Sequence, residues 1–260
     1  MVKFFKYQGA GNDFILTDNR LNSSDRYSEE LIRSLCDRRF GIGADGVMAL
    51  HDKKGYDFEM VYYNADGKPG SMCGNGGRCI VAFAKHLGII ASETNFLAVD
   101  GPHYAKISES SDWVSLQMNN LDIITRDKDG FVLDTGSPHY VSLVNDLKNK
   151  DVYTAGHSIR YNSTYADEGI NVNFVEDLGD HYFVRTYERG VEDETFACGT
   201  GATAAAMTMA MLKELRGHIN TQIKVLGGKL NIQFDYDGMC FTNVFLEGPA
   251  TLVFEGSIDI

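Results

Sequence analysis

Basic residues are scarce in this sequence, and their scarcity restricts the partners that the protein can have. There are 24 Lys and Arg residues against 36 Asp and Glu residues, which gives a formal net charge of −12 at pH 7. A surface with this charge repels phosphate backbones and anionic membranes. We therefore expect neither nucleic acid nor a membrane surface as a partner.

Long hydrophobic runs are also missing. The longest apolar stretch, about residues 202–212, is much shorter than the ~20 residues that cross a bilayer. Residues 1–7 contain no apolar segment followed by a small-residue cleavage site. We expect a cytoplasmic protein with no membrane span.

Cysteine motifs for metals and disulfides are absent. The five cysteines are odd in number and scattered, so they form no disulfide framework in a chain of this size and should be free thiols in a reducing compartment. No Cys-x2-Cys or His-Glu-x2-His spacing and no phosphate-cradling lysine motif is present. Zinc and pyridoxal phosphate therefore have no support, and we expect no cofactor.

What the sequence does contain predicts a mixed α/β protein. Residues 28–39 resemble a surface helix with Ser28 as N-cap and Gly41 just after its end. Residues 75–87 and 199–215 are apolar on nearly all helical faces, which is typical of buried helices. Strands are predicted by alternating segments such as 57–63 and 113–118. Gly227-Gly228 and Asp237-Gly238 separate alternating runs and predict two successive hairpins.

An internal repeat is the most informative feature. The motifs Cys-Gly-Asn-Gly-Gly at 73–77 and Cys-Gly-Thr-Gly-Ala at 198–202 lie 125 residues apart, and each opens a buried helix. Tyr62 and Tyr187 each lie eleven residues before their cysteine. We therefore expect two pseudosymmetric lobes that face each other, each a mostly antiparallel sheet or barrel wrapped around one central helix.

The repeat also predicts where the lobes begin and end. We place the N-terminal lobe at 1–117, with a C-terminal strand at about 251–260 that can return to it, and the C-terminal lobe at 118–250.

Two matched cysteines suit the inversion of an α-carbon, which needs a base on one face and an acid on the other. The reference pKa of a thiol is about 8.5, and the partial positive charge of a helix N-terminus lowers it. Two thiolates near one substrate would repel, which favours one thiolate and one thiol. The Gly-x-Gly segments would let backbone N–H groups approach an α-carboxylate and stabilise its enolate-like form.

Each of these residues has an ordinary structural reading when taken alone. A lone buried cysteine is usually a small hydrophobic residue, and this reading stands for Cys36, Cys79 and Cys240. Asn12 and Asn64 would be turn residues. His139 would be a core or surface histidine, and the adjacent Glu188 and Arg189 a surface pair of little energetic weight.

Five motifs, in order along essentially the whole chain, resemble the diaminopimelate epimerase family. They are Gly-Ala-Gly-Asn-Asp-Phe at 9–14, Gly-Ile-Gly-Ala-Asp-Gly at 41–46, Tyr-Asn-Ala-Asp-Gly at 63–67 leading to the cysteine motif at 72–79, Asn-Val-Asn-Phe at 171–174, and the segment 187–195 leading to 197–201.

The resemblance implies a fold and an activity. The fold is a pseudosymmetric two-lobed α/β fold, and the activity is the interconversion of LL- and meso-2,6-diaminopimelate in lysine and peptidoglycan precursor synthesis. The resemblance also implies no cofactor and a homodimer.

Roles for single residues follow from the matching positions. Cys73 and Cys198 resemble the acid–base pair, and His139 and Glu188 lie beside the thiols and modulate their pKa. The substrate-binding residues implied are Asn12, Asn64, Gly74, Asn75, Asn171, Glu188, Arg189, Gly199 and Thr200.

Two departures bear on the substrate. Ser137 stands where many members have Asn, and Gly46 stands where some have Gln. The alternatives are therefore a racemase of another amino acid, such as histidine or lysine, and a non-catalytic amino-acid-binding protein.

Overall fold

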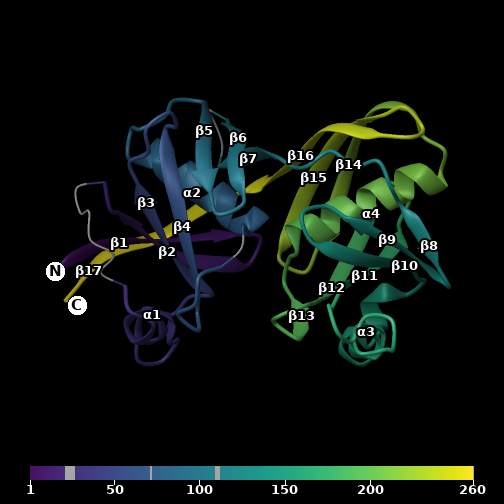
Figure 1. Ribbon diagram of the computed structural model, residues 1–260, viewed down its shortest axis with the longest axis horizontal. Coiled ribbons are helices and arrows are strands. Elements are labelled where there is room, and N and C mark those ends of the chain that lie inside the picture. Colours follow the sequence, from purple (N-terminus) through teal and green to yellow (C-terminus); the bar gives the residue numbers. More distant parts are fainter. Residues whose placement is uncertain (21–26, 71, 109–111, 260) are drawn as a thin grey trace. The chain divides into compact units, whose positions relative to one another are not determined.

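The computed structural model describes residues 1–20, 27–70, 72–108 and 112–259 (Figure 1). The chain forms two compact units. Unit 1 comprises Met1–Leu116 together with Gly248–Ile260, and unit 2 comprises Gln117–Glu247. The chain therefore leaves unit 1 once, builds unit 2 from one continuous stretch, and returns.

Unit 1 is a succession of hydrogen-bonded strands. In spatial order they are β17 (Thr251–Ile258), β1 (Val2–Gly9), β2 (Asn12–Asp18), β3 (Gly46–His51), β4 (Phe58–Asn64), β5 (Glu93–Ala98), β6 (Gly101–Ile107) and β7 (Trp113–Gln117). The pairs β2–β3 and β4–β5 are parallel, and the other pairs are antiparallel.

Unit 2 repeats this arrangement. Its main strands are β8 (Thr125–Asp127), β9 (Gly130–Asp134), β10 (Pro138–Leu143), β11 (Asn171–Asp177), β12 (Tyr182–Glu188), β14 (Gly217–Val225), β15 (Gly228–Tyr236) and β16 (Phe241–Pro249), and the short β13 (Asp193–Thr195) lies beside β12. The parallel pairs are β10–β11 and β12–β14, at the equivalent places.

The repeat is also visible in the strand registers, where equivalent pairs of residues occur in the two units. Phe14 pairs with Gly46 in unit 1, and His139 pairs with Asn171 in unit 2. Both partners are displaced by the same 125 residues that separate the two cysteines. Most strand pairs are antiparallel, as predicted, but the alternating pattern could not show that two pairs in each unit are parallel.

One central helix is buried in each unit, as the sequence predicted. The helices are α2 (Gly74–His86) and α4 (Gly199–Leu212), with residues 74–84 and 201–210 buried. Cys73 and Cys198 are their N-caps, and both have extended backbone conformations. Figure 1 shows each helix running among the strands of its own unit.

An outer helix covers the other face of each sheet. In unit 1, α1 (Glu29–Cys36) starts at the predicted cap, where the Ser28 side chain accepts from the Leu31 N–H. It ends before the predicted Arg39 because the N–H groups of Ile42 and Gly43 turn back to the Leu35 carbonyl.

The outer helix of unit 2 was not predicted from the sequence. It is α3 (Val152–Arg160), preceded by a short 3-10 turn, Leu147–Asn149. Gly156 weakens the helical signal in the sequence, yet a Cβ there would lie 2.3 Å from the Tyr187 Cβ. Glycine therefore lets α3 approach the sheet closely.

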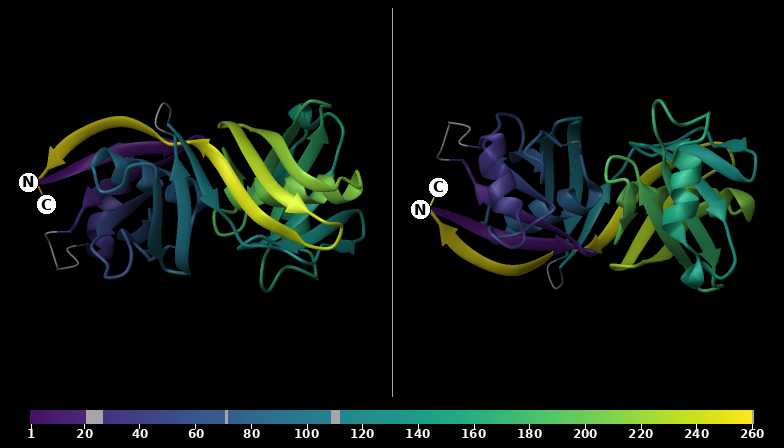
Figure 2. Two further views of the ribbon diagram at one scale, coloured as in Figure 1. Left: turned by 90° about the horizontal axis from the view of Figure 1, so that it is seen from above. Right: turned by 90° about the horizontal axis from the view of Figure 1, so that it is seen from below.

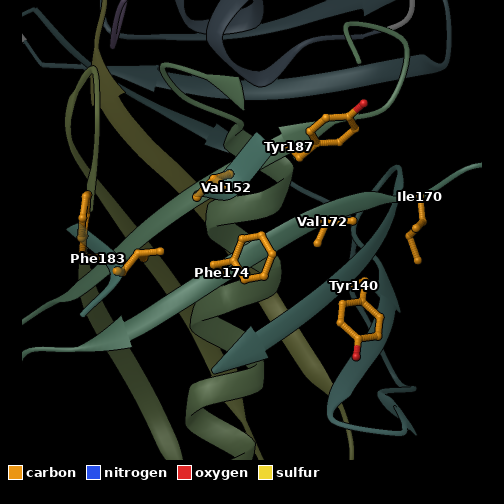
Figure 3. Close-up of a cluster of buried hydrophobic side chains, with 8 residues drawn as sticks. Tyr140, Val152, Ile170, Val172, Phe174, Phe183 and Tyr187 are labelled. Carbon is orange, nitrogen blue, oxygen red and sulfur yellow. The ribbon is translucent and has the colours of Figure 1, made fainter. Parts of the chain in front are cut away.

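Packing under α3 explains why β11 is buried on both faces. Val172 and Phe174 belong to a hydrophobic cluster with Val152 of α3 and with Tyr187 (Figure 3). Side chains alternate along a strand, so Asn171 and Asn173 point to the opposite face. That face packs against α4.

The C-terminal strands form the predicted meander. β14, β15 and β16 are successive antiparallel hairpins. β17 then returns to unit 1 and pairs with β1, so both termini lie at one end of unit 1 (Figure 2). Among the described residues, no helix is both long and apolar enough to span a membrane.

Candidate active site

The Cys73 half-site lies at the start of α2 in unit 1. The Cys73 Sγ lies 3.6 Å from the Oδ1 of Asn12, and the Nδ2 of Asn75 donates to the same oxygen at 3.3 Å. The first-turn N–H groups of a helix have no acceptor inside the helix. A thiol, two amides and a positively polarised helix start therefore converge at one place.

Two charged side chains fix the orientation of these amides. The Nδ2 of Asn12 donates to Asp45 at 2.5 Å, and Asp45 is paired with Arg38 at 2.7 Å. The Nη2 of Arg78 donates to the Oδ1 of Asn75 at 2.9 Å. Arg78 is fully buried, so this guanidinium adds positive charge beneath the start of α2.

Asp13 belongs to the same network, because it also pairs with Arg38, at 2.6 Å. Burial acts to raise the pKa of its carboxyl, but hydrogen bonds from Arg38 and Lys6 outweigh burial and lower the pKa to about 2. Lys6 is itself buried and ion-paired with Asp13 at 2.8 Å. Asp13 is therefore ionised at neutral pH.

The Cys198 half-site lies at the start of α4 in unit 2. The Cys198 Sγ lies 3.5 Å from the Thr200 Oγ1, which lies 2.9 Å from the Nε2 of His139. Asn173 contacts the other ring nitrogen at 2.9 Å. Burial, together with the positive charge of Arg189, lowers the pKa of His139 to about 3, so the imidazole is neutral near pH 7.

Polar groups continue from this half-site along the ends of β10, β11 and β12. Asn171 donates to the Ser137 Oγ at 2.9 Å and accepts from the Arg189 N–H at 2.9 Å. The Arg189 Nη2 lies 3.5 Å from the same Ser137 oxygen. Glu188 ends β12 and accepts from Thr195 at 2.9 Å. An arginine, an amide, a hydroxyl and a carboxylate can together hold an amino-acid zwitterion.

Within each unit, the structure gathers most of the predicted site residues. Unit 1 brings together Cys73, Gly74, Asn75 and Asn12, and unit 2 brings together Cys198, Gly199, Thr200, His139, Asn171, Glu188 and Arg189. Asn64 lies exposed at the end of β4, opposite Gly46 in the ladder.

Gly46 and the second glycine of each repeat have packing reasons. A Cβ at Gly46 would lie 2.5 Å from the Tyr62 ring, so this ring occupies the space where a larger side chain would stand. A Cβ at Gly201 would lie 2.2 Å from the Asn173 Oδ1. From the sequence alone, the glycines of the repeat, such as Gly201, are predicted only to let backbone N–H groups approach an anion.

The remaining cysteines lie apart from both half-sites or are sealed in the core. Burial raises the pKa of Cys36 to about 11 and that of Cys79 to about 12. Cys240 lies in the turn between β15 and β16. In the described part of the chain, no group of three or more His, Cys, Asp or Glu residues is placed to hold a metal ion.

Four site residues were not singled out from the sequence. They are Asp45, Arg78, Asn173 and Thr186, the last of which donates its hydroxyl to the Asn173 Oδ1 at 2.9 Å. Asp45, Arg78 and Asn173 lie inside the quoted motifs, and Asn173 follows Asn171 at the spacing that places both on one strand face. Their partners are distant in sequence, so only the fold reveals the contacts.

A family sequence model and individual relatives identify the same family for this chain. The sequence model of the family described as diaminopimelate epimerase matches residues 4–123 and 131–253. The diaminopimelate epimerase of Flavobacterium psychrophilum is 51% identical over 258 residues, which is 99% of this chain and 100% of that protein. The diaminopimelate epimerase of Chlorobaculum tepidum is 41% identical, with 97% of this chain and 99% of that protein covered.

Solved structures with low sequence identity share the fold. A phenazine biosynthesis protein of the PhzF family from Bacillus anthracis matches with a TM-score of 0.77 at 12% identity, covering 100% of this chain and 99% of that one. A hydroxyproline epimerase from Agrobacterium vitis matches with a TM-score of 0.70 at 13% identity, covering 98% and 91%. These likenesses confirm the predicted fold class.

Proposed function

The chain belongs to the diaminopimelate epimerase family, and we propose that it interconverts LL- and meso-2,6-diaminopimelate with Cys73 and Cys198 as the two acid–base groups. The observation that carries the proposal is the duplicated cysteine. In each unit, one cysteine caps the N-terminus of the buried central helix. Two equivalent thiols meet the requirement of a reaction that removes a proton from one side of a carbon and returns it to the other.

The helix starts supply the second part of the chemistry. Backbone N–H groups of the first turns of α2 and α4 bind the α-carboxylate, which gains enolate-like charge when the α-proton leaves. Donors fixed in advance stabilise this charge more in the transition state than in the ground state. Such a donor is worth about 2.7–4 kcal/mol.

The polar cluster of unit 2 supports a substrate with a second amino-acid end. Arg189 offers a planar pair of donors to a carboxylate, and Asn171, Ser137 and Glu188 offer acceptors to an ammonium group. We assign the distal zwitterion of diaminopimelate to this cluster. Asn12 and Asn64 complete the proposed substrate contacts in unit 1.

Substitution of either cysteine by alanine tests the acid–base roles. We expect C73A and C198A each to lose at least 10²-fold of epimerase activity, because each lacks one proton-transfer group. The assay is chiral chromatography of the products formed from LL-diaminopimelate. C240A is the matched control and should keep wild-type turnover, because Cys240 lies in a β-turn outside both half-sites. Near-normal turnover in C73A or C198A would contradict the proposal.

Substrate panels and isotope exchange separate the alternatives. Racemisation of histidine or lysine in preference to diaminopimelate would indicate the other-substrate reading. A non-catalytic binder would bind diaminopimelate but never introduce solvent deuterium at the α-carbon. We expect α-deuteration of diaminopimelate by the wild-type enzyme.

We also propose that the enzyme is a cytoplasmic homodimer. A reducing compartment keeps both active thiols reduced, and the family resemblance supports the dimer. Sedimentation equilibrium of the purified protein would test the dimer, and a single species with the mass of one chain would contradict it.

A further inference from the structure

We propose that the hydrogen-bond networks of the two units prepare the cysteines for opposite roles before substrate binds, with Cys198 held as the thiolate and Cys73 as the thiol. This inference rests on the proposed function, because it assigns a starting direction to the same pair of residues. It makes Asn173, Thr186 and Asp45 positioning residues.

The argument begins at Asn173, whose amide can have only one orientation. One of its side-chain contacts is with the Tyr140 carbonyl at 3.2 Å, a group that can only accept. The atom facing Tyr140 must therefore be the NH₂ group. The Oδ1 on the other side accepts from the Thr186 hydroxyl at 2.9 Å. Asn173 is fully buried, so solvent does not compete for these positions.

The orientation of Asn173 fixes the tautomer of His139. The second N–H of the amide faces the ring Nδ1 at 2.9 Å, so Nδ1 must accept. The ring is neutral because burial and Arg189 lower its pKa to about 3. Its single proton therefore lies on Nε2, which faces the Thr200 hydroxyl at 2.9 Å.

The tautomer of His139 then directs the Thr200 hydroxyl. Its oxygen accepts from Nε2–H, so its own hydrogen is free to point elsewhere, and the Cys198 Sγ lies 3.5 Å away. A hydroxyl that donates to sulfur stabilises the thiolate over the thiol. The whole series, from Thr186 through Asn173, His139 and Thr200, donates in one direction and ends at Cys198.

The network around Cys73 has the opposite polarity. The Asp45 carboxylate can only accept, so the Asn12 atom that faces it at 2.5 Å must be Nδ2. The Asn12 Oδ1 is thereby turned toward Cys73 at 3.6 Å, where it accepts from the S–H. An acceptor beside sulfur favours the thiol, and in this assignment it outweighs the positive charge of the buried Arg78, which acts on Cys73 in the opposite sense.

The same direction follows from the other side of Cys73. Arg78 can only donate, so the Asn75 atom facing it is Oδ1. The Asn75 Nδ2 therefore donates to Asn12, which agrees with the orientation that Asp45 imposes.

Charged residues occur on several elements that pack against the Cys198 network, including Lys224 of β14 and Lys229 of β15. Glu188 and Arg189 lie at the end of β12, and the exposed Asp134 lies at the end of β9. Helix α4 has no charged residue, and β11 has its acidic residues, Glu176 and Asp177, at its far end. Within this network, the Thr200 hydroxyl is the group that lies beside the Cys198 Sγ.

The reaction that follows has a defined first step. The Cys198 thiolate takes the α-proton, so an S–H bond forms as the C–H bond breaks and its electron pair remains on the substrate as an enolate. Cys73 then gives its thiol proton to the carbon and becomes the thiolate. One turnover therefore leaves both cysteines in the reverse protonation states, and proton exchange with solvent restores the starting form.

Alkylation of the ligand-free enzyme measures the two thiols separately. The protein is treated with iodoacetamide at low conversion from pH 5 to 10, and mass spectrometry of peptides reports each cysteine. We expect half-maximal alkylation of Cys198 at a pH at least about one unit below that of Cys73. Cys36 and Cys79 give separate peptides. A lower midpoint for Cys73 than for Cys198 would overturn the inference.

Three threonine variants locate the cause. Thr200→Val removes the hydroxyl with little change of shape and should raise the Cys198 midpoint by about one pH unit or more. Thr200→Ser retains the hydroxyl and should restore the wild-type midpoint. Thr208→Val is the matched control, because Thr208 is buried in the same helix but donates to the Ala204 carbonyl. An unmoved Cys198 midpoint in Thr200→Val would refute the relay.

Nuclear magnetic resonance of ¹⁵N-labelled histidine rings reads the tautomer directly in the wild-type protein. The His139 signals, assigned by their loss in His139→Gln, should be those of the neutral Nε2–H form at pH 7. An Nδ1–H tautomer or an imidazolium would overturn the inference.

The alanine variants of the proposed function distinguish the two failures. If C73A and C198A lose activity but the midpoints are reversed, the two-cysteine mechanism stands and the assigned direction falls. If both variants remain active, the proposed function itself falls.

Discussion

His139 is the residue in which burial most clearly controls charge. It is fully buried, and its ring is surrounded by amide and hydroxyl groups that satisfy the neutral form. Burial and the Arg189 charge lower its pKa from 6.5 to about 3. In the unfolded chain the same ring takes up a proton near pH 6.5.

This difference predicts how stability depends on pH. As pH falls below about 6.5, the unfolded state binds a proton that the folded state refuses, so the free energy of unfolding decreases. The slope from this residue reaches about 1.4 kcal/mol per pH unit. Urea unfolding of the wild type at pH 7, 6 and 5 should show this decrease, and His139→Gln should show a shallower one.

The choice of pH range isolates His139 from Asp13. The pKa of Asp13 is lowered from 3.8 to about 2, so its stabilising charge is lost only as pH falls from about 4 toward 2. Equal slopes for the wild type and His139→Gln between pH 7 and 5 would contradict the prediction.

Gly201 illustrates a second residue-scale effect, the close approach of a helix to a fixed side chain. A Cβ here would lie 2.2 Å from the Asn173 Oδ1, and this amide is held by Tyr140, His139 and Thr186. At the equivalent Gly76, the Cβ would meet the Met48 Cε at 2.1 Å, and a methionine methyl can rotate away.

The two glycines should therefore respond differently to alanine. We expect Gly201→Ala to lose about 1–3 kcal/mol of stability from overpacking and at least tenfold of activity. Gly76→Ala should lose less stability, because Met48 yields and alanine favours the helix by about 0.5–1 kcal/mol. Thermal unfolding and the epimerase assay measure both effects. Equal losses in the two variants would show that Asn173 is not held as described.

Among secondary-structure elements, those with a local cause could be predicted. The buried helices, the hairpins of the meander and the start of α1 follow from apolar periodicity, Gly-rich turns and the Ser28 cap. Helix α3 could not, because its Gly156 is explained only by contact with Tyr187. Strand direction also lay beyond the sequence, since alternation is the same in parallel and antiparallel pairs.

The cap of α1 provides a prediction for an element. Ser28→Ala removes the acceptor of the Leu31 N–H and should lower the free energy of unfolding by about 1 kcal/mol. Ser34→Ala is the matched control in the same helix. Ser34 is exposed, and alanine is the better helix former, so stability should stay equal or rise slightly. Urea unfolding compares the two, and equal losses would contradict the role of Ser28.

At the scale of the whole molecule, duplication made the fold and the two cysteines predictable. The motif at 73–77 returns at 198–202, and the strand registers follow the same displacement. The contacts of the positioning residues could not be predicted in this way. Asp45 lies 33 residues from Asn12, and Asn173 lies 34 residues from His139. No local sequence pattern therefore predicts these two contacts.

The last strand supplies the whole-molecule prediction. β17 has no fully buried residue, so its main contribution is to cover the edge of β1. Removal of residues 251–260 should speed amide hydrogen exchange in β1 and leave β14–β16 unchanged, as read by mass spectrometry. Removal of residues 259–260 alone, beyond β17, is the control. Unchanged exchange in β1 after the longer deletion would contradict this role.

The return of β17 also sets the order in which the units can be completed during synthesis. Unit 2 draws its strands from one continuous stretch, so its sheet can close once residue 247 has left the ribosome. Unit 1, although its first strands emerge earliest, waits for residues 251–258 to pair with β1. Vectorial synthesis usually lets the N-terminal domain fold first. Here the nascent chain holds an unfinished N-terminal unit until the whole of unit 2 has been synthesised.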